Sequence, residues 1–320
     1  MPMTIASLAL ALALLTATAG SSSGGTTDTD TTFNVPANAR LELDNFSGEI
    51  AVRTWTRNAV RVEADHGSRV SIDVDVSSTT VSIRARDRRG FPTTVDYRLT
   101  VPAAMALELS GVSTEISVTG SRGEIKASTV NGDVVVDGGV RFVSLNSVEG
   151  EVKLTGAKAR MEVSSVNQGI AIERSVGDVV AETVNGDIEL DVDASRVEAS
   201  TVNGSIEYDG PYKDDGAYTF STHNGDILLT MPEKVNATVS VATFSGDFKS
   251  SFPLQMSGTR RGKRFDFTLG TGKSRVELES FQGSIRIRRP GEVDVKGKHD
   301  SDHDHDEDAD PDEDGEDHQP

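Results

Sequence analysis

A row of acidic side chains is the feature of this sequence that could most directly do chemistry. Its members are Asp133, Glu151, Asp187, Asp226 and Asp247, and each directly follows a glycine. A line of carboxylates along one edge of a fold could bind Ca²⁺ or a polysaccharide. Gly169 and Ser205 interrupt the row, however, and the glycine-rich nonapeptide of calcium-binding repeats is absent. We therefore interpret these acidic side chains as solvated turn residues.

Stacked carboxylates could also serve a carbohydrate-active β-helix enzyme, which remains an alternative. Such an enzyme needs a non-repeating cluster of carboxylates accompanied by Arg, Lys or His for acid-base work. The regular part of the sequence contains no such break in its pattern, and it contains neither a phosphate-binding loop nor a nucleophile elbow. We therefore expect a non-enzymatic protein and assign no catalytic or cofactor-binding residue.

Two histidines, His66 and His223, lie outside the C-terminal tail. His223 occupies a turn position where other copies of the same motif have valine, so we expect a surface residue with no catalytic role. Trp55 and Tyr97 are expected to pack against other side chains rather than to form a platform for a ligand.

The C-terminal segment, residues 291–320, is predicted to be a disordered, acidic tail. From His299 onward it holds nine Asp, three Glu and no Lys or Arg. Such a composition leaves almost nothing to bury. Three histidines that alternate with Asp are weak candidate ligands for Zn²⁺, Ni²⁺ or Cu²⁺, namely His299, His303 and His305. Weak metal binding by a periplasmic protein through this tail is a further alternative, although we assign no fixed metal site.

A repeat of 18 residues organises the centre of the chain. Five blocks begin at Ser128, Asn146, Ser164, Glu182 and Ser200. The third residue of every block is Val, the fifth is Gly in four blocks, and the seventh is Val or Ile. A fixed period of this length indicates a repeat architecture, in which each unit buries its apolar side chains against its neighbours.

The repeat predicts an all-β fold, a β-solenoid resembling a parallel β-helix with coils of about 18 residues. Each block contains two apolar patches about nine residues apart, so one coil should hold two short strands and two turns. An antiparallel β-meander with the same spacing is the alternative. Matching residues favour the solenoid, because they would lie about 4.8 Å apart there and about twice as far apart in a meander.

The flanks extend the predicted β-repeat domain to residues 33–290. Residues 33–109 alternate apolar with polar side chains, as strands with one buried face do. Three prolines, Pro36, Pro102 and Pro232, are expected at strand ends, because proline cannot donate to a strand ladder. After Gly204 the period loosens, with a loop insertion at Gly210–Gly216 and a concentration of phenylalanine that we expect to close the stack.

The N-terminus indicates export. Residues 1–19 contain an apolar run that ends in a small-x-small motif, Ala17–Ala19, and are predicted to be a signal peptide rather than a membrane span. Residues 20–32 are predicted to be a flexible linker. The sequence has no cysteine, which is compatible with export. Its net charge of −19 argues against a nucleic-acid partner.

Three elements carry a resemblance to a known family: the segments Leu99–Pro102 and Leu107–Leu109, and the serial copies of Thr-Val-Asn-Gly-Asp-Ile. They resemble the putative-adhesin, toastrack-like family of bacterial β-repeat proteins. The resemblance implies an exported solenoid in the periplasm, at the cell surface or outside the cell, and it transfers no catalytic residue. Our leading hypothesis is therefore an adhesion or scaffold protein of the cell envelope, with a surface protein or a glycan as its partner.

Overall fold

The computed structural model describes residues 26–253 and 263–292. Within them the chain forms 24 strands and no helix. The first twelve strands are β1 (Thr26–Asn34), β2 (Arg40–Trp55), β3 (Ala59–Gly67), β4 (Val70–Val76), β5 (Thr80–Asp87), β6 (Val95–Pro102), β7 (Ala106–Ser121), β8 (Ile125–Thr129), β9 (Val134–Gly138), β10 (Val140–Ser147), β11 (Val152–Thr155) and β12 (Lys158–Ser164). The others are β13 (Ile170–Val176), β14 (Val179–Glu182), β15 (Ile188–Asp193), β16 (Arg196–Asn203), β17 (Ile206–Asp209), β18 (Ala217–Asn224), β19 (Ile227–Thr230), β20 (Ala237–Thr243), β21 (Phe248–Ser250), β22 (Lys263–Leu269), β23 (Ser274–Gln282) and β24 (Ile285–Arg288).

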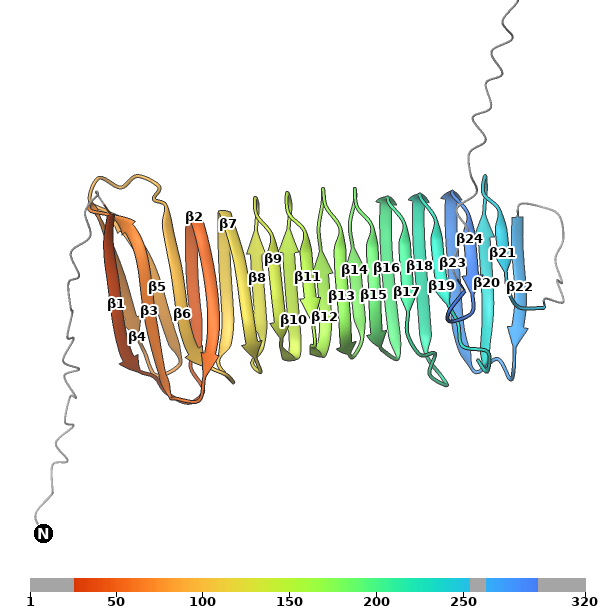
Figure 1. Ribbon diagram of the computed structural model, residues 1–320, viewed down its shortest axis with the longest axis horizontal. Coiled ribbons are helices and arrows are strands. Elements are labelled where there is room, and N and C mark those ends of the chain that lie inside the picture. Colours follow the sequence, from red (N-terminus) through yellow and green to blue (C-terminus); the bar gives the residue numbers. More distant parts are fainter. Residues whose placement is uncertain (1–25, 254–262, 293–320) are drawn as a thin grey trace, which may run out of the picture. The chain divides into compact units, whose positions relative to one another are not determined.

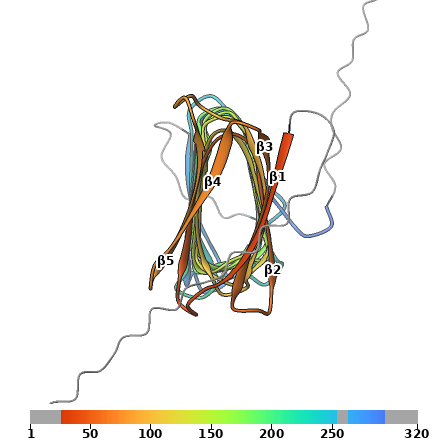
Figure 2. The same ribbon diagram turned by 90° about the vertical axis from the view of Figure 1, so that its left-hand side faces the viewer.

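The strands lie side by side (Figure 1) and form two layers around a shared interior (Figure 2). In the first layer, hydrogen-bonded neighbours follow the order β4, β5, β2, β7, β8, β10, β12, β14, β16, β18, β23, β20 and β22. In the second layer the order is β1, β3, β6, β2, β7, β9, β11, β13, β15, β17, β19, β24 and β21. The long strands β2 and β7 contribute one half to each layer.

The core is built from columns of aliphatic side chains. One column contains Val134, Val152, Ile170, Ile188 and Ile206, which are successive partners in a parallel register 18 residues apart. None of them is more than 2% exposed. Burial of one such side chain stabilises a fold by about 1.5–3 kcal/mol, so the repeated position is itself a main source of stability.

The prediction of an all-β fold is confirmed, and the arrangement is solenoid-like. The described strand pairs from β7 to β19 are all parallel. The alternative of an antiparallel meander is therefore wrong for the repeat region. Antiparallel pairs among the described strands occur only near the two ends, in β1–β3, β3–β6, β4–β5 and β20–β22.

At both ends the order of strands in space departs from their order in the sequence. Strand β2 lies between β7 and the pair β5 and β6, although β5 and β6 come between β2 and β7 in the chain. In the same way, β23 lies between β18 and β20, and β24 lies between β19 and β21. At each end, therefore, one coil is inserted between two others that it does not follow in the sequence: β2 at the N-terminal end, and β23 with β24 at the C-terminal end.

Strand β1 corrects the predicted start of the β-repeat domain. Residues 20–32 were predicted to be a flexible linker, but β1 begins at Thr26 and pairs along its whole length with β3. Arg61 holds the two strands together through two hydrogen bonds to Asp30, of 3.0 and 2.8 Å. The same contact lowers the pKa of the Asp30 carboxyl. The run of Thr and Asp contains few apolar residues, so only this tertiary pairing marks it as a strand.

Large side chains close the C-terminal end, as the sequence predicts. The rings of Phe265 and Phe267 on β22 stack on Phe248 of β21, at centroid distances of 5.4 and 5.9 Å. The expected positions of Pro36, Pro102 and Pro232 are also confirmed, since Pro102 ends β6 and the other two follow β1 and β19.

The two turn edges of the stack differ. We call the edge where the chain passes from the first layer to the second the regular edge; its turns are residues 46–48, 112–115, 130–133, 148–151, 166–169, 184–187, 202–205, 223–226, 244–247 and 281–284. The opposite edge is called the variable edge, and its turns are residues 119–124, 138–139, 156–157, 174–178, 193–195, 210–216 and 231–236.

A buried ladder of hydroxyl groups holds the regular edge together. Its members are Thr129, Ser147, Ser165, Thr183, Thr201, Thr222 and Ser280. Each donates a hydrogen bond of 2.9–3.2 Å to a turn carbonyl of the adjacent coil. The buried hydroxyl groups are thereby paired with turn carbonyls, as burial of a polar group requires.

Glycine is needed at the regular edge mainly because successive turns lie very close together. A Cβ atom built on Gly150 or Gly204 would overlap the carbonyl oxygen of the turn glycine in the adjacent coil. Neither residue has a positive φ angle. The short distance between coils, and not tolerance of a positive φ angle, therefore requires glycine at these two positions.

Candidate functional site

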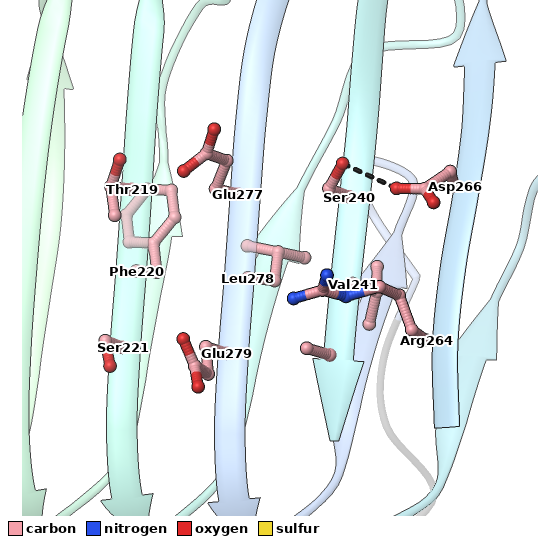
Figure 3. A pocket seen from close by; sticks show the side chains of 11 residues that line it. Thr219, Phe220, Ser221, Ser240, Val241, Arg264, Asp266, Glu277, Leu278 and Glu279 are labelled. Atoms are coloured by element: carbon pink, nitrogen blue, oxygen red, sulfur yellow. Dashed lines mark hydrogen bonds between the residues drawn. The ribbon is translucent and has the colours of Figure 1, made fainter. Parts of the chain in front are cut away.

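A shallow depression of about 300 Å³ lies on the outer surface of the first layer near its C-terminal end. It is formed by β18, β23, β20 and β22, and Figure 3 shows its lining side chains. Its polar members are Thr219, Ser221, Ser240, Arg264, Asp266, Glu277 and Glu279. Because alternate residues of a strand point outward, the side chains of the four strands form rows across the depression.

The strand register places these polar side chains in two rows. The first row contains Thr219, Glu277, Ser240 and Asp266, and the second contains Ser221, Glu279, Ala242 and Arg264. Within the first row, the Ser240 hydroxyl donates a 2.7 Å hydrogen bond to Asp266 (Figure 3). The depression thus offers three carboxylates, one guanidinium and several hydroxyls within four adjacent strands.

The carboxylates of the depression are exposed. Glu277, Glu279 and Asp266 all lie at the open surface, as does Arg264. A catalytic general acid is usually held in a buried, apolar environment, which these carboxylates lack. The arrangement is therefore suited to accepting hydrogen bonds from hydroxyl or amino groups of a ligand, while Arg264 can donate to an acceptor.

Sequence reasoning missed this cluster, although it named such a cluster as the mark of an enzyme. The cluster lies outside the regular coils, because Arg264 and Asp266 come from β22 and the two glutamates come from β23. The alternation of Glu277-Leu278-Glu279 does predict which side chains point outward. It does not predict that β20 lies between β22 and β23, so the cluster could not be assembled from the sequence.

The acidic row after the turn glycines has a structural role. Asp133, Asp187 and Asp226 each accept a hydrogen bond of 2.7–2.8 Å from a backbone N–H of the adjacent coil. These carboxylates therefore fix the spacing between turns, in agreement with their interpretation as turn residues. Among the described residues, no three His, Cys, Asp or Glu side chains are placed to hold a metal ion.

The histidines divide between the core and the surface. His66 is buried, and its ring nitrogens lie 2.8 Å from the Thr29 hydroxyl and 3.1 Å from the Gly67 carbonyl, so it helps to hold β1 against β3. His223 is exposed, as predicted, and its ring stacks on Phe281 at 4.7 Å. The weak candidate metal ligands His299, His303 and His305 lie outside the described residues.

The other aromatic candidates have packing roles. Tyr97 is fully buried, and burial strongly raises the pKa of its hydroxyl. Trp55 donates a 2.7 Å hydrogen bond to the Ala59 carbonyl. In the Gly210–Gly216 loop, Tyr212 packs edge-on against Tyr208 at 5.4 Å, and burial raises its pKa well above the ordinary value. The loop insertion therefore fills the interior instead of forming a site.

Comparison with known proteins assigns the chain to a family. The sequence model of the family described as Toastrack DUF4097 matches residues 16–288. No curated protein matches the chain. Among the described residues, the chain has no helical segment with the length and hydropathy that a membrane span requires.

Several solved structures are similar at low identity. One, described as a putative adhesin from Parabacteroides merdae, is 11% identical over 82% of this chain and 96% of its own, with a TM-score of 0.41. Another, a putative adhesin from Bacteroides fragilis, is 14% identical over 82% and 97%, with a TM-score of 0.40. A third, described as a putative lipid binding protein from Parabacteroides distasonis, is 12% identical over 82% and 97%, with a TM-score of 0.40. Because these scores lie below 0.5, the family match alone carries the assignment.

Proposed function

The chain belongs to the Toastrack DUF4097 family, and on this premise we propose that it is an exported, non-enzymatic adhesion or scaffold protein of the cell envelope or cell surface. The depression over β18, β23, β20 and β22 is the observation that carries the proposal. It is open, polar and assembled on a continuous β surface, which suits the recognition of a polar group on a surface glycan or protein.

The charge pattern supports binding in preference to catalysis. Glu277 and Glu279 lie on one strand, Arg264 lies in the same row as Glu279, and all three side chains are exposed to solvent. Exposed carboxylates lose little hydration on binding, so they can accept hydrogen bonds from sugar hydroxyls at low cost. Export remains a prediction from the apolar segment in residues 1–19, which lies outside the described residues.

The test is binding to a glycan array and to cell-wall fractions of the native host. We expect the full chain to bind a subset of glycans and the double variant Glu277→Gln, Glu279→Gln to lose at least about 10-fold in affinity. The matched control is Glu189→Gln, an exposed glutamate of β15 outside the depression. An unchanged affinity of the double variant would contradict a binding role for this depression.

A carbohydrate-active enzyme is a second candidate, because the acidic and basic side chains of the depression form the non-repeating cluster that such an enzyme needs. The release of reducing ends from a polysaccharide, abolished by Glu277→Gln or Glu279→Gln, would favour it over the adhesin. Weak metal binding by His299, His303 and His305 stays a prediction, to be tested by zinc titration of the chain with and without residues 299–320.

A further inference from the structure

A row of exposed apolar side chains runs along the regular edge. In spatial order its members are Phe46, Val112, Val130, Val148, Val166, Val184, Val202, His223, Phe281 and Phe244. We call this row the apolar stripe. Its nine hydrophobic members are 37–69% exposed. With ten coils spaced by about 4.8 Å, the stripe is about 43 Å long.

The fold does not require this stripe. From Val130 onward, the Ser or Thr before each stripe residue is buried, and glycine allows the close approach of the coils, whereas the valine between them points to solvent. Of the 13 exposed large hydrophobic residues in the described part of the chain, nine belong to the stripe. Apolar side chains concentrated in this way mark an interaction surface.

The flanks of the stripe are almost free of charge. On one side lie Asp44, Ser110, Ser128, Asn146, Ser164, Glu182, Ser200, Ser221, Ala242 and Glu279. On the other side lie Ser47, Ser113, Asn131, Glu149, Asn167, Asn185, Asn203, Asn224, Ser245 and Gln282. Sixteen of these twenty residues are uncharged, and the four charged ones are acidic. Depletion of charge around an apolar centre is typical of the middle of a protein interface.

We propose that the apolar stripe binds a second copy of this chain, in antiparallel orientation about a two-fold axis between Val166 and Val184. Both copies carry side chains at the same spacing, so the two rows can face each other along their whole length. The axis pairs Val166 with Val184 of the second copy and Phe46 with its Phe244, so apolar groups meet at the centre and at the ends. The stripe with its two flanks holds 30 residues, ten in each of three columns, and a stable interface uses about 20–30 residues from each partner.

Other occupants are less well matched. A bilayer surface usually attracts proteins through basic side chains, whereas the charged residues in the flanks are acidic and the whole chain has a net charge of −19. A single extended peptide could reach along the 43 Å length, but one strand about 4.8 Å wide would leave the two flanks uncovered. The proposal concerns self-association and does not rest on the adhesin function.

Sedimentation of the full chain over a wide range of concentration tests the proposal. We expect a dimer for the native sequence and at least about 100-fold weaker association for the double variant Val166→Lys, Val184→Lys, because four charges would face one another across the axis. The matched control is Val176→Lys with Val135→Lys; each of these valines is 43% exposed and lies outside the stripe. An unaltered circular-dichroism spectrum confirms that the variants fold. A native chain that stays monomeric, or equal loss of dimer in the control, would overturn the proposal.

The orientation can be tested independently, because the chain has no cysteine of its own. A mixture of Phe46→Cys and Phe244→Cys chains should form a disulfide-linked dimer on mild oxidation, whereas Phe46→Cys alone should not. Cross-linking of Phe46→Cys with itself would indicate a parallel pair and overturn the antiparallel arrangement. Flotation of monomers with phosphatidylcholine vesicles, lost in Val166→Lys, Val184→Lys, would instead assign the stripe to a lipid surface and overturn the proposal.

Discussion

The regular edge and the variable edge connect the same two layers, yet they are built differently. Most turns of the regular edge repeat one plan, with a buried Ser or Thr hydroxyl, an outward apolar or aromatic residue, and a close backbone contact. The turns at Phe46 and Val112 have Asn45 and Gly111 in place of the hydroxyl residue. At the variable edge the turns differ in length and carry ion pairs, such as Lys213 with Asp193 and Lys273 with Asp214, each at 2.6 Å. Lys153 also pairs with Glu173 at 2.6 Å near this edge.

The difference shows how a repeat protein divides two tasks. Contacts of fixed geometry at the regular edge set the spacing between coils. Because each coil has to make the same contacts, the same residue types recur from coil to coil. The variable edge absorbs changes in length, such as the Gly210–Gly216 loop, because ion pairs at a solvated surface tolerate several geometries. A mutation should therefore cost more at the regular edge, and the predictions below test this from the largest effect to the smallest.

The largest effect is expected for Gly204→Ala. Its Cβ would overlap the carbonyl oxygen of Gly186, so two coils would have to move apart, at a cost of about 3 kcal/mol in the free energy of unfolding. At the variable edge, Gly156→Ala meets no atom closer than 3.5 Å and should cost only about 1 kcal/mol, through its positive φ of 68°. Urea unfolding measures both variants.

Gly67 provides a control for the glycine variants, because a Cβ there has open space and the φ angle is not positive. Gly67→Ala should change the free energy of unfolding by no more than about 0.5 kcal/mol. Equal losses for Gly204→Ala and Gly156→Ala would show that the two edges constrain the backbone alike.

The hydroxyl ladder should contribute the next largest effect. Thr183→Val keeps the shape of a buried side chain but removes its 3.0 Å hydrogen bond to the Gln168 carbonyl, at a cost of about 1–1.5 kcal/mol. Thr119→Val replaces an exposed threonine at the variable edge and should stay within about 0.5 kcal/mol of the native chain. A comparable loss from Thr119→Val in urea unfolding would contradict the special role of the ladder.

The side-chain amides of the regular edge should contribute less. The Asn185 amide donates to Asn167 at 3.1 Å and its oxygen accepts from Asn203 at 2.8 Å, and all three side chains face solvent. Asn185→Ala should cost about 0.5–1 kcal/mol. A double-mutant cycle of Asn185→Ala with Asn203→Ala isolates the pair, and strictly additive losses would mean that the amides do not interact in solution.

The smallest effect concerns charge at the variable edge. A hydrogen bond from Lys153 lowers the pKa of the Glu173 carboxyl in the folded chain. Its stabilising contribution is therefore present above the unfolded carboxyl pKa and is lost as the pH falls through the lower folded pKa. The small difference in stability between the native chain and Glu173→Gln should disappear at acid pH and at high salt. A difference that persists in acid would contradict this origin, and Asn185→Ala should show no such pH dependence.

Local pattern predicted the centre of the molecule well. The seventh residue of each 18-residue block, for example Val152 or Ile188, was expected to be buried, because copies that contact one another are free to be identical. The row of carboxylates after the turn glycines does lie in turns, and Asp187 accepts a backbone hydrogen bond there.

The ends and the candidate site could not be derived in the same way. Their contacts join strands far apart in the sequence, such as the pair of Ala217 with Arg275. An 18-residue period does not predict which of these strands are neighbours. The N-terminal strand was missed for the same reason, because the Thr and Asp of β1 become a strand only by pairing with β3. The repeat predicts that the valines of the apolar stripe form a column, but only the structure shows that their side chains point outward.

The inserted coil at the C-terminal end has a consequence for synthesis on the ribosome. Among the described pairings, β20 bonds only to β22 and β23, and β21 bonds only to β24. Strands β20, β21 and β22 therefore emerge before β23 and β24, which attach them to the stack. The last coil to be translated is the one that locks its predecessors in place, so a ribosome that stops early releases a chain whose C-terminal cap has nowhere to dock.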